Sequence, residues 1–134
     1  MERAKILVVD DDEEMRCLLE DVLVQEGYHV TQARDGPDAL LKLRNQKYDL
    51  VIIDKNMPGL SGLEILPGIK MMDPQAIVVF ITAFGDVDTY LEAMSRGAYD
   101  YLNKPLRMSV LKSVIGKALR EKRKGSPFDL QREV

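Results

Sequence analysis

The segment Leu50 to Gly59, LVIIDKNMPG, constrains the fold more than any other part of the chain. Its first four residues are apolar without a polar break, and the valine and isoleucines among them favour extended backbone. Such a short apolar run is typical of a strand buried on both faces in the middle of a parallel sheet. The run ends at Asp54, and Pro58 with Gly59 then favour a loop. The segment therefore predicts a carboxylate where a central strand leaves its sheet, the edge at which open α/β sheets bind ligands.

Four further segments are expected to form strands, and helical patterns alternate with them along the chain. The other strands are expected at 6–9, 28–33, 77–81 and 99–102. Apolar residues at helical spacing predict helices after the acids at 10–14, from 35–37, over about 62–72, from 86, and over about 108–123. This alternation predicts an α/β fold, a doubly wound five-stranded parallel sheet of the flavodoxin-like (βα)5 kind. The strand order 2-1-3-4-5 is expected, because it leaves the alternating segment 28–33 on an edge.

The spacing also predicts which helix faces are buried and where one helix is interrupted. Pro67 and Gly68 fall inside the third helix, which Ser61 and Glu64 are expected to begin as a capping box. Because proline lacks a backbone N–H and clashes with the preceding turn, a kink or an early break is expected there. The first helix is expected to bury Met15, Leu18, Leu19, Val22 and Leu23, and the fourth Val87, Tyr90, Leu91 and Met94.

Length, composition and charge exclude several classes of protein. A chain of 134 residues, 46% hydrophobic and 31% charged, suits one soluble globular domain. No apolar run approaches the ~20 residues of a membrane span, and the N-terminus lacks a signal-peptide pattern. With a net charge of -3, the domain lacks the excess of positive charge that is typical of nucleic acid binding. The single cysteine, Cys17, cannot form an internal disulfide, so a cytoplasmic location is expected.

Polar side chains follow four of the five expected strands. Asp10 and Asp11 follow the first, Asp54 ends the third, Thr82 follows the fourth and Lys104 follows the fifth. In the order 2-1-3-4-5 these ends lie at one edge, where clustered carboxylates repel one another and favour a divalent cation. Oxygen ligands in a partly open site favour Mg²⁺, which often binds phosphate oxygens. The set predicts a phosphoryl group held by a lysine and a hydroxyl, with an aspartate as its oxygen nucleophile.

The motifs ILVVDDD, IIDKNMPGLSG, ITA and GAYDYLNKP together resemble receiver domains of bacterial two-component response regulators, similar to the CheY type. The resemblance covers about residues 4–122 and implies that Asp54 accepts a phosphoryl group from a sensor histidine kinase or a phosphotransfer protein. It also implies that Mg²⁺ is bound by Asp11, Asp54 and the backbone carbonyl of Asn56, with Asp10 supporting the site through water.

The same resemblance assigns roles at the fourth and fifth strands. Thr82 and Lys104 would contact the phosphoryl group, and Tyr101 matches the aromatic switch position of the family. The Lys104–Pro105 peptide bond is often cis in such domains. The stretch 85–102 is similar to receivers attached to NtrC-type transcriptional activators. Phosphorylation is then expected to be sensed on the surface of the fourth helix, fifth strand and fifth helix, by an output domain, a downstream protein or a second copy in a homodimer.

The alternatives to a phosphoacceptor are a phosphatase, a dinucleotide-binding domain and a protein-interaction scaffold. A haloacid-dehalogenase-type phosphatase needs a second aspartate two residues after the nucleophile, and Asn56 stands there, so a turnover enzyme is disfavoured. A dinucleotide-binding domain needs a glycine-rich turn after the first strand, where this chain has acids at 10–14. A receiver-like protein-interaction scaffold that is never phosphorylated stays open as the alternative.

The remaining features are expected to be peripheral. His29 should be exposed on the edge strand, and the basic residues between 120 and 124 should form a solvated helix end. Phe84 is expected to slow loss of the phosphoryl group by restricting the attacking water. Residues 1–124 are expected to form the domain, and 125–134 a short tail or the start of a linker, so the chain is a stand-alone receiver or part of a longer protein.

Overall fold

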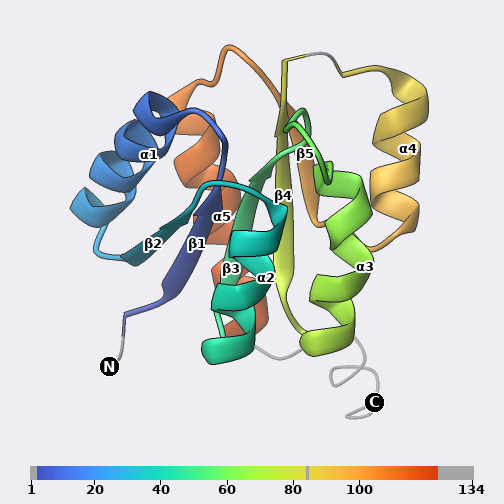
Figure 1. Cartoon of the computed structure of the whole chain (residues 1–134). Helices are drawn as coiled ribbons and strands as arrows, with labels where there is room; N and C mark the ends of the chain where they lie inside the picture. Colours follow the sequence, from blue (N-terminus) through green and yellow to red (C-terminus); the bar gives the residue numbers. More distant parts are fainter. Residues whose placement is uncertain (1–2, 84, 124–134) are drawn as a thin grey trace, which may run out of the picture.

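The computed structural model describes residues 3–83 and 85–123 and shows within them a five-stranded parallel sheet (Figure 1). The strands lie in the order β2-β1-β3-β4-β5, which confirms the expected topology. Segment 28–33 supplies the edge strand, whose residues are mostly half-buried or exposed. The strand bounds are β1 Lys5–Val9, β2 His29–Ala33, β3 Leu50–Asp54, β4 Ile77–Thr82 and β5 Asp100–Asn103.

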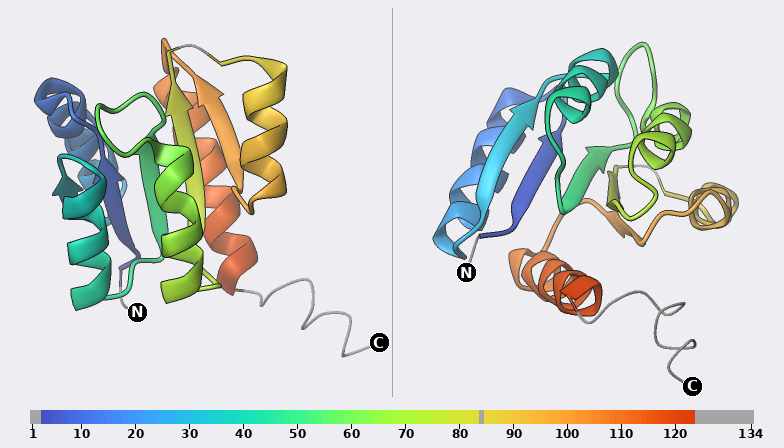
Figure 2. Two further views of the ribbon diagram at one scale, coloured as in Figure 1. Left: turned by 45° about the vertical axis from the view of Figure 1, so that its right-hand side comes forward. Right: turned by 90° about the horizontal axis from the view of Figure 1, so that it is seen from below.

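Helices cover both faces of the sheet (Figure 2). One core layer joins the sheet to α2, α3 and α4 through residues such as Ala39, Ile65 and Ala93. The other joins it to α1 and α5 through residues such as Leu19 and Leu111. The helix bounds are α1 Glu13–Gln25, α2 Gly36–Asn45, α3 Gly62–Met72, α4 Val87–Ser95 and α5 Met108–Arg123.

The unbroken apolar runs in the sequence are explained by these two layers. In β3 all five residues are buried, and alternate residues enter opposite layers: Val51 and Ile53 enter one, Leu50 and Ile52 the other. A strand covered on both sides has no solvent face, so it needs no polar alternation. The strand that presents Asp54 is therefore held rigidly along its whole length.

The helix starts follow capping rules that the sequence already displayed. Ser61 and Glu64 form the expected capping box of α3, with the serine hydroxyl accepting from the Glu64 N–H and the glutamate accepting from the Ser61 N–H. Asp35 caps α2 through the N–H of Asp38, and a proline occupies the first turn. Asp12 caps α1 in the same manner, directly beside the acids at the end of β1.

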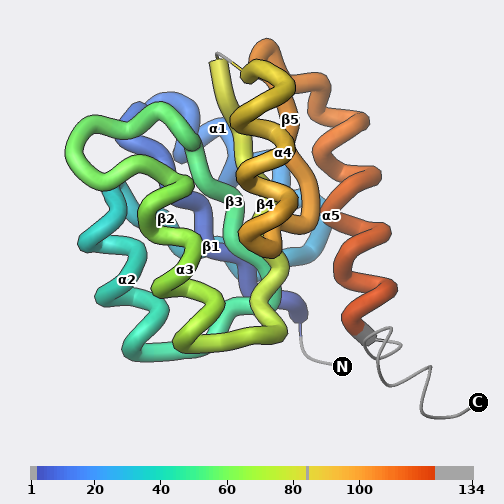
Figure 3. Tube along the Cα trace, turned by 90° about the vertical axis from the view of Figure 1, so that its right-hand side faces the viewer, coloured from blue at the N-terminus to red at the C-terminus, as the bar shows by residue number. Residues whose placement is uncertain are grey.

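Part of the expected burial on α1 and α4 is wrong. Leu18 is 46% exposed, whereas its neighbour Leu19 is buried. On α4, Val87 and Leu91 are 72% and 57% exposed, and Ala93 is the buried residue. α4 lies beside β5 at the margin of the sheet (Figure 3). Part of its apolar face is therefore left uncovered, and Tyr90, which was also expected to be buried, is 41% exposed.

Of the kink or early break expected in α3 at Pro67, the break is wrong, since the helix is continuous from Gly62 to Met72, and the kink stays a prediction. Proline supplies no N–H for the carbonyl of Leu63, four residues earlier. The guanidinium of Arg96, at the end of α4, donates to that carbonyl at 3.3 Å. A side chain from a neighbouring helix thus satisfies the backbone oxygen that the proline leaves without its helical partner.

The peripheral features were mostly as expected. Cys17 and His29 are exposed. Lys122 departs from the expectation of a solvated helix end, because its Nζ donates to the carbonyl of Asp49 at 3.1 Å and ties α5 to the start of β3. Within the described ranges, no helix is both long and apolar enough to cross a membrane. The segment 125–134 and Phe84 lie outside the described residues, so the domain end and the expectation for Phe84 stay predictions.

Candidate functional site

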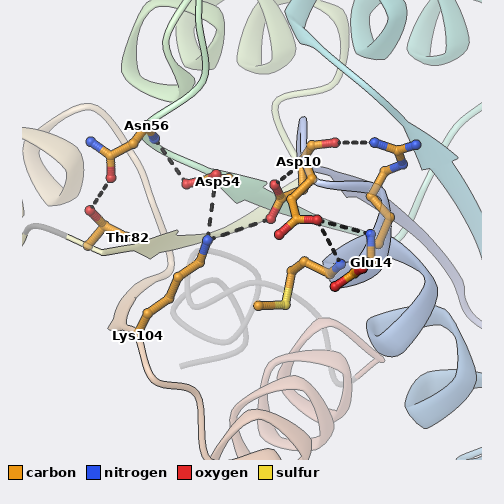
Figure 4. Close-up of polar contacts among 9 residues, drawn as sticks. Asp10, Glu14, Asp54, Asn56, Thr82 and Lys104 are labelled. Carbon is orange, nitrogen blue, oxygen red and sulfur yellow. Dashed lines mark hydrogen bonds and ion pairs between the residues drawn. The ribbon is translucent and has the colours of Figure 1, made fainter.

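The ends of β1, β3, β4 and β5 bring the predicted polar residues to one edge of the sheet (Figure 4). Because all five strands are parallel, their carboxyl ends share that edge, and β1 and β3 are direct neighbours. Asp10 follows β1, Asp54 ends β3, Thr82 ends β4 and Lys104 follows β5. Residues that are distant in sequence therefore lie close together because of the strand order.

Three carboxylates form the centre of the site. Oxygens of Asp10, Asp11 and Asp54 all lie within 4.8 Å of one another. Asp10 and Asp54 are buried, 2% and 5% exposed, whereas Asp11 is exposed. Hard oxygen donors at this separation, open to solvent on one side, suit a cation such as Mg²⁺ that keeps several waters. The donor set therefore fits a divalent metal ion.

Burial and mutual repulsion act on the acid cluster. Burial, with a further contribution from the charge of Asp54, raises the pKa of Asp10 to about 6, despite the opposing effects of the Asp12 N–H and Lys104. The N–H of Asp12 donates to Asp10 Oδ1 at 2.9 Å. A bound cation would oppose both effects, because a nearby positive charge favours the ionised form of a carboxyl group.

Lys104 supplies the positive charge of the described site. Its Nζ lies 3.7 Å from Asp54 Oδ2 and 3.9 Å from Asp10 Oδ2. The side chain extends from the loop after β5, and the Lys104–Pro105 peptide bond is cis. These distances are ion-pair contacts to two carboxylates at once, and they place a cation directly beside Asp54.

Asn56 and Thr82 join the site through a chain of hydrogen bonds. The backbone N–H of Asn56 donates to Asp54 Oδ1 at 3.0 Å. The hydroxyl of Thr82, which is fully buried, donates to the side-chain oxygen of Asn56 at 2.7 Å. This side-chain bond was not predicted, because no local pattern relates the last residue of β4 to a residue in the loop after β3. The metal role expected for the Asn56 backbone carbonyl stays a prediction.

Tyr101 lies apart from the carboxylates, in the layer between β5 and α4. The residue is 7% exposed, and its hydroxyl lies 2.9 Å from the hydroxyl of Thr89 on α4. Its ring packs against Phe80 at a centroid distance of 6.4 Å and edge-on against Tyr90 at 5.9 Å. The structure thus shows the ring in an inward position, joined to the first turn of α4.

Arg16 was missed by the sequence reasoning. From α1 its guanidinium donates to the backbone carbonyl of Asp10 at 2.7 Å and to the side chain of Gln32 on β2 at 3.0 Å. An arginine on an amphipathic helix usually gives no sequence signal of such a contact, because surface arginines have the same spacing. Its place next to the acids is therefore information that only the fold supplies.

The fold, together with the acids and Lys104 at the carboxyl edge of the sheet, defines a CheY-like domain. Comparisons with known proteins agree. The family model described as the response regulator receiver domain matches residues 6–116. The receiver domain protein (CheY-like) from Methanospirillum hungatei JF-1 superposes with a TM-score of 0.90 at 26% identity, over 93% of this chain and 100% of that one. NtrX from Brucella abortus gives 0.88 at 36% identity, over 99% of this chain and 31% of NtrX.

The relatives found by sequence include a transcriptional regulatory protein and a sporulation phosphotransferase. The transcriptional regulatory protein ZraR of Klebsiella oxytoca is 42% identical over 118 residues, which are 88% of this chain and 27% of ZraR. Sporulation initiation phosphotransferase F of Bacillus subtilis is 36% identical over 119 residues, 89% of this chain and 96% of that protein. The chain belongs to the response regulator receiver domains of two-component systems, with NtrC-type relatives among its matches. It spans about a quarter of the length of the ZraR proteins.

Proposed function

We propose that this domain is a phosphoacceptor, which takes a phosphoryl group onto Asp54 from a histidine kinase or a phosphotransfer protein in the cytoplasm. The observation that supports the proposal most strongly is the grouping of three carboxylates and Lys104 at the end of a central strand. Phosphoryl transfer asks a protein mainly for positioning and for neutralisation of charge. The described site has a nucleophile, a cation and a donor set for a metal ion.

The proposed reaction uses the atoms around Asp54. In the proposal, a carboxylate oxygen of Asp54 attacks the phosphorus and the bond to the donor's imidazole nitrogen breaks. The imidazole leaves as the neutral ring after taking up a proton from solvent, and an acyl phosphate forms on Asp54. Oδ1 of Asp54 is held by the Asn56 N–H and Oδ2 faces Lys104. In the proposal, Lys104 neutralises the added charge and the Thr82 hydroxyl donates to a phosphoryl oxygen.

A metal ion completes the proposed site. Asp11, Asp54 and the backbone carbonyl of Asn56 would hold Mg²⁺, and Asp10 would act through a bridging water. The ion would neutralise phosphoryl oxygens and reduce the repulsion among the acids. The exposure of Asp11 next to two buried acids supports the proposal, since a metal ion has to enter from solvent.

The proposed output is a change of the surface formed by α4, β5 and α5. Thr82 and Tyr101 are its proposed switch residues. The exposed apolar side chains of Val87 and Leu91 on α4 suit a surface that a partner covers. The proposed partner is an output domain, a downstream protein or a second copy of the domain. In this proposal the domain assists its own phosphorylation and dephosphorylation and is not a turnover enzyme.

The test is phosphorylation by acetyl phosphate in the presence of Mg²⁺, with the modified residue mapped by mass spectrometry. One phosphoryl group on Asp54 is expected in the parent, and none in Asp54→Asn. Asp21→Asn, an exposed acid on α1, is the matched control and should be labelled like the parent. Asp11→Ala should fold and yet lose both Mg²⁺ affinity and label. Label that persists in Asp54→Asn would overturn the assignment to Asp54. A parent that takes no label would favour the scaffold alternative instead.

A further inference from the structure

We propose that Arg16 is a positioning residue for the metal-binding acids, and that it acts by holding the peptide between Asp10 and Asp11. The inference rests on the proposed function, because it concerns the affinity of that site for Mg²⁺. Arg16 touches none of the three clustered carboxylates through a hydrogen bond or ion pair among the described contacts. Its effect would pass through the backbone.

The guanidinium joins three elements at the edge of the sheet. It projects from α1, donates to the carbonyl of Asp10 after β1 at 2.7 Å, and donates to Gln32 of β2 at 3.0 Å. The planar fork of arginine fixes both bonds at once, so the direction of the Asp10 carbonyl is set relative to two strands and a helix. A bond from a charged donor is also stronger than a neutral one.

Asp10 is held on its other sides as well. Its N–H donates to the carbonyl of Ala33 at 3.1 Å, and its side chain accepts from the N–H of Asp12 at 2.9 Å. With Arg16 on the carbonyl, the backbone and the side chain of this residue are all restrained. The restraint therefore reaches the next residue through a peptide plane that has little freedom to rotate.

Asp11 depends on that peptide plane more than its two partners do. In the described part of the chain, no hydrogen bond or ion pair holds its carboxylate, and the residue is exposed. By contrast, Lys104 faces the carboxylates of Asp10 and Asp54. The direction of Asp11 into the cluster is therefore set by its backbone, and Arg16 is the side chain that fixes the carbonyl at the start of the shared peptide.

The charge of Arg16 predicts the opposite effect from its position. A cation near the cluster would repel Mg²⁺, so if only charge mattered, removing it would tighten metal binding. If Arg16 positions Asp11, removing it weakens binding, because loss of a group that orients metal ligands commonly costs ~10-fold or more in affinity. The sign of the change therefore separates the two roles.

The experiment titrates the unphosphorylated domain with Mg²⁺ alone by calorimetry. Arg16→Ala should bind Mg²⁺ about tenfold more weakly. Arg16→Lys, which keeps the charge and loses the fork, and Gln32→Ala, which keeps Arg16, should each show a smaller loss. Arg96→Ala is the matched control, because it too removes a guanidinium bond to a backbone carbonyl but lies on α4. It should lower thermal stability and leave Mg²⁺ affinity unchanged.

Amide NMR adds a readout that a general loss of stability would not produce. In metal-free Arg16→Lys, the signals of Asp11 and Asp12 should shift or broaden while those of β3 and β4 stay in place. Mg²⁺ affinity that is unchanged or tighter in Arg16→Lys and Gln32→Ala would overturn the inference. A parent domain that binds no Mg²⁺ would instead overturn the proposed function on which the inference rests.

Discussion

The hydroxyl of Thr82 donates to the side-chain oxygen of Asn56 at 2.7 Å, and so links the end of β4 to the loop after β3. The same loop donates its Asn56 N–H to Asp54. The hydroxyl that is proposed to contact a phosphoryl group thus has an acceptor already. Phosphorylation would have to exchange that acceptor, and the side chain of Asn56 competes with the phosphoryl oxygens for the same donor.

Asn56→Ala is therefore expected to increase the affinity for beryllofluoride, a phosphoryl mimic. The variant keeps the backbone carbonyl proposed as a metal ligand and removes the competing acceptor. Since a typical net hydrogen bond contributes ~1 kcal/mol, the gain should be about fivefold, measured by NMR titration in Mg²⁺. In a Thr82→Val background the same substitution should change nothing. A weaker or equal affinity in the Thr82 parent would show that Asn56 does not compete.

The acid cluster predicts the pH dependence of stability in the metal-free domain. The pKa of Asp10 is raised to about 6, above its ordinary value of 3.8, so the native state binds more protons than the unfolded state between these values. The free energy of unfolding should therefore fall as the pH rises from about 4 to about 6, by on the order of 1 to 3 kcal/mol.

Urea unfolding with a chelator at several pH values measures this effect. Asp10→Asn should be more stable than the parent above pH 6 and should lose the decline between pH 4 and 6. The pKa of Asp38 is lowered by the Arg34 N–H and Lys42, although burial opposes this. Its stabilisation should therefore be lost only as the pH falls below its ordinary range. A parent whose stability rises through pH 4 to 6 would contradict the assignment to Asp10.

The edge of the sheet could be read from the sequence because strand ends are marked locally. Apolar runs that stop at Asp10 and at Asp54 show where each strand leaves the sheet, and parallel order places those ends together. This prediction of the site needs only the hydrophobic periodicity of each segment and the parallel direction of the strands. It is insensitive to errors of a residue or two in the bounds, as for β5.

Contacts between side chains could not be predicted in the same way. Periodicity shows that α4 has an apolar face. It does not show that this helix, which lies at the margin of the sheet, leaves Val87 and Leu91 exposed to solvent. Likewise, the partner of the Leu63 carbonyl comes from Arg96 on another helix. Such contacts depend on the relative placement of helices, which tertiary packing decides after each local pattern is satisfied.

The bond from Arg96 to the Leu63 carbonyl, which Pro67 leaves without a helical donor, predicts a coupling energy between Arg96 and Pro67. Arg96→Ala should cost ~1 kcal/mol of stability in the parent, because the Leu63 carbonyl loses its donor. In Pro67→Ala, the new backbone N–H reaches that carbonyl, so Arg96→Ala should cost less. A double-mutant cycle by urea unfolding is expected to give a coupling of ~0.5 to 1 kcal/mol.

Glu92 supplies the control for this cycle. It forms an exposed ion pair with Arg96 at 2.7 Å, and such pairs contribute ~0 to 1 kcal/mol. Glu92→Ala should therefore cost little and should not couple to Pro67. Equal costs of Arg96→Ala in the two backgrounds would mean that its value lies in the ion pair and not in the helix carbonyl.

The inward position of Tyr101 predicts how phosphorylation of Asp54 would change the surface of α4, β5 and α5. The hydroxyl of Tyr101 lies 2.9 Å from that of Thr89, so the side chain joins β5 to the first turn of α4. An aromatic ring with a polar tip is stable either buried or with its hydroxyl in water, and two such arrangements biased by one ligand make a switch. A phosphoryl mimic that draws Thr82 towards Asp54 should change the space beside Tyr101 and shift the balance between them.

Amide and side-chain NMR with and without beryllofluoride tests this path. Signals between residues 86 and 115 should shift along with those around Asp54. In Tyr101→Ala the mimic should still bind, because Tyr101 lies outside the acid cluster, and the changes in α4 should become small. Thr31→Val on β2 is a control that should respond like the parent. Shifts confined to the surroundings of Asp54 in the parent would show that Tyr101 is a fixed core residue, and that α4, β5 and α5 do not sense phosphorylation through it.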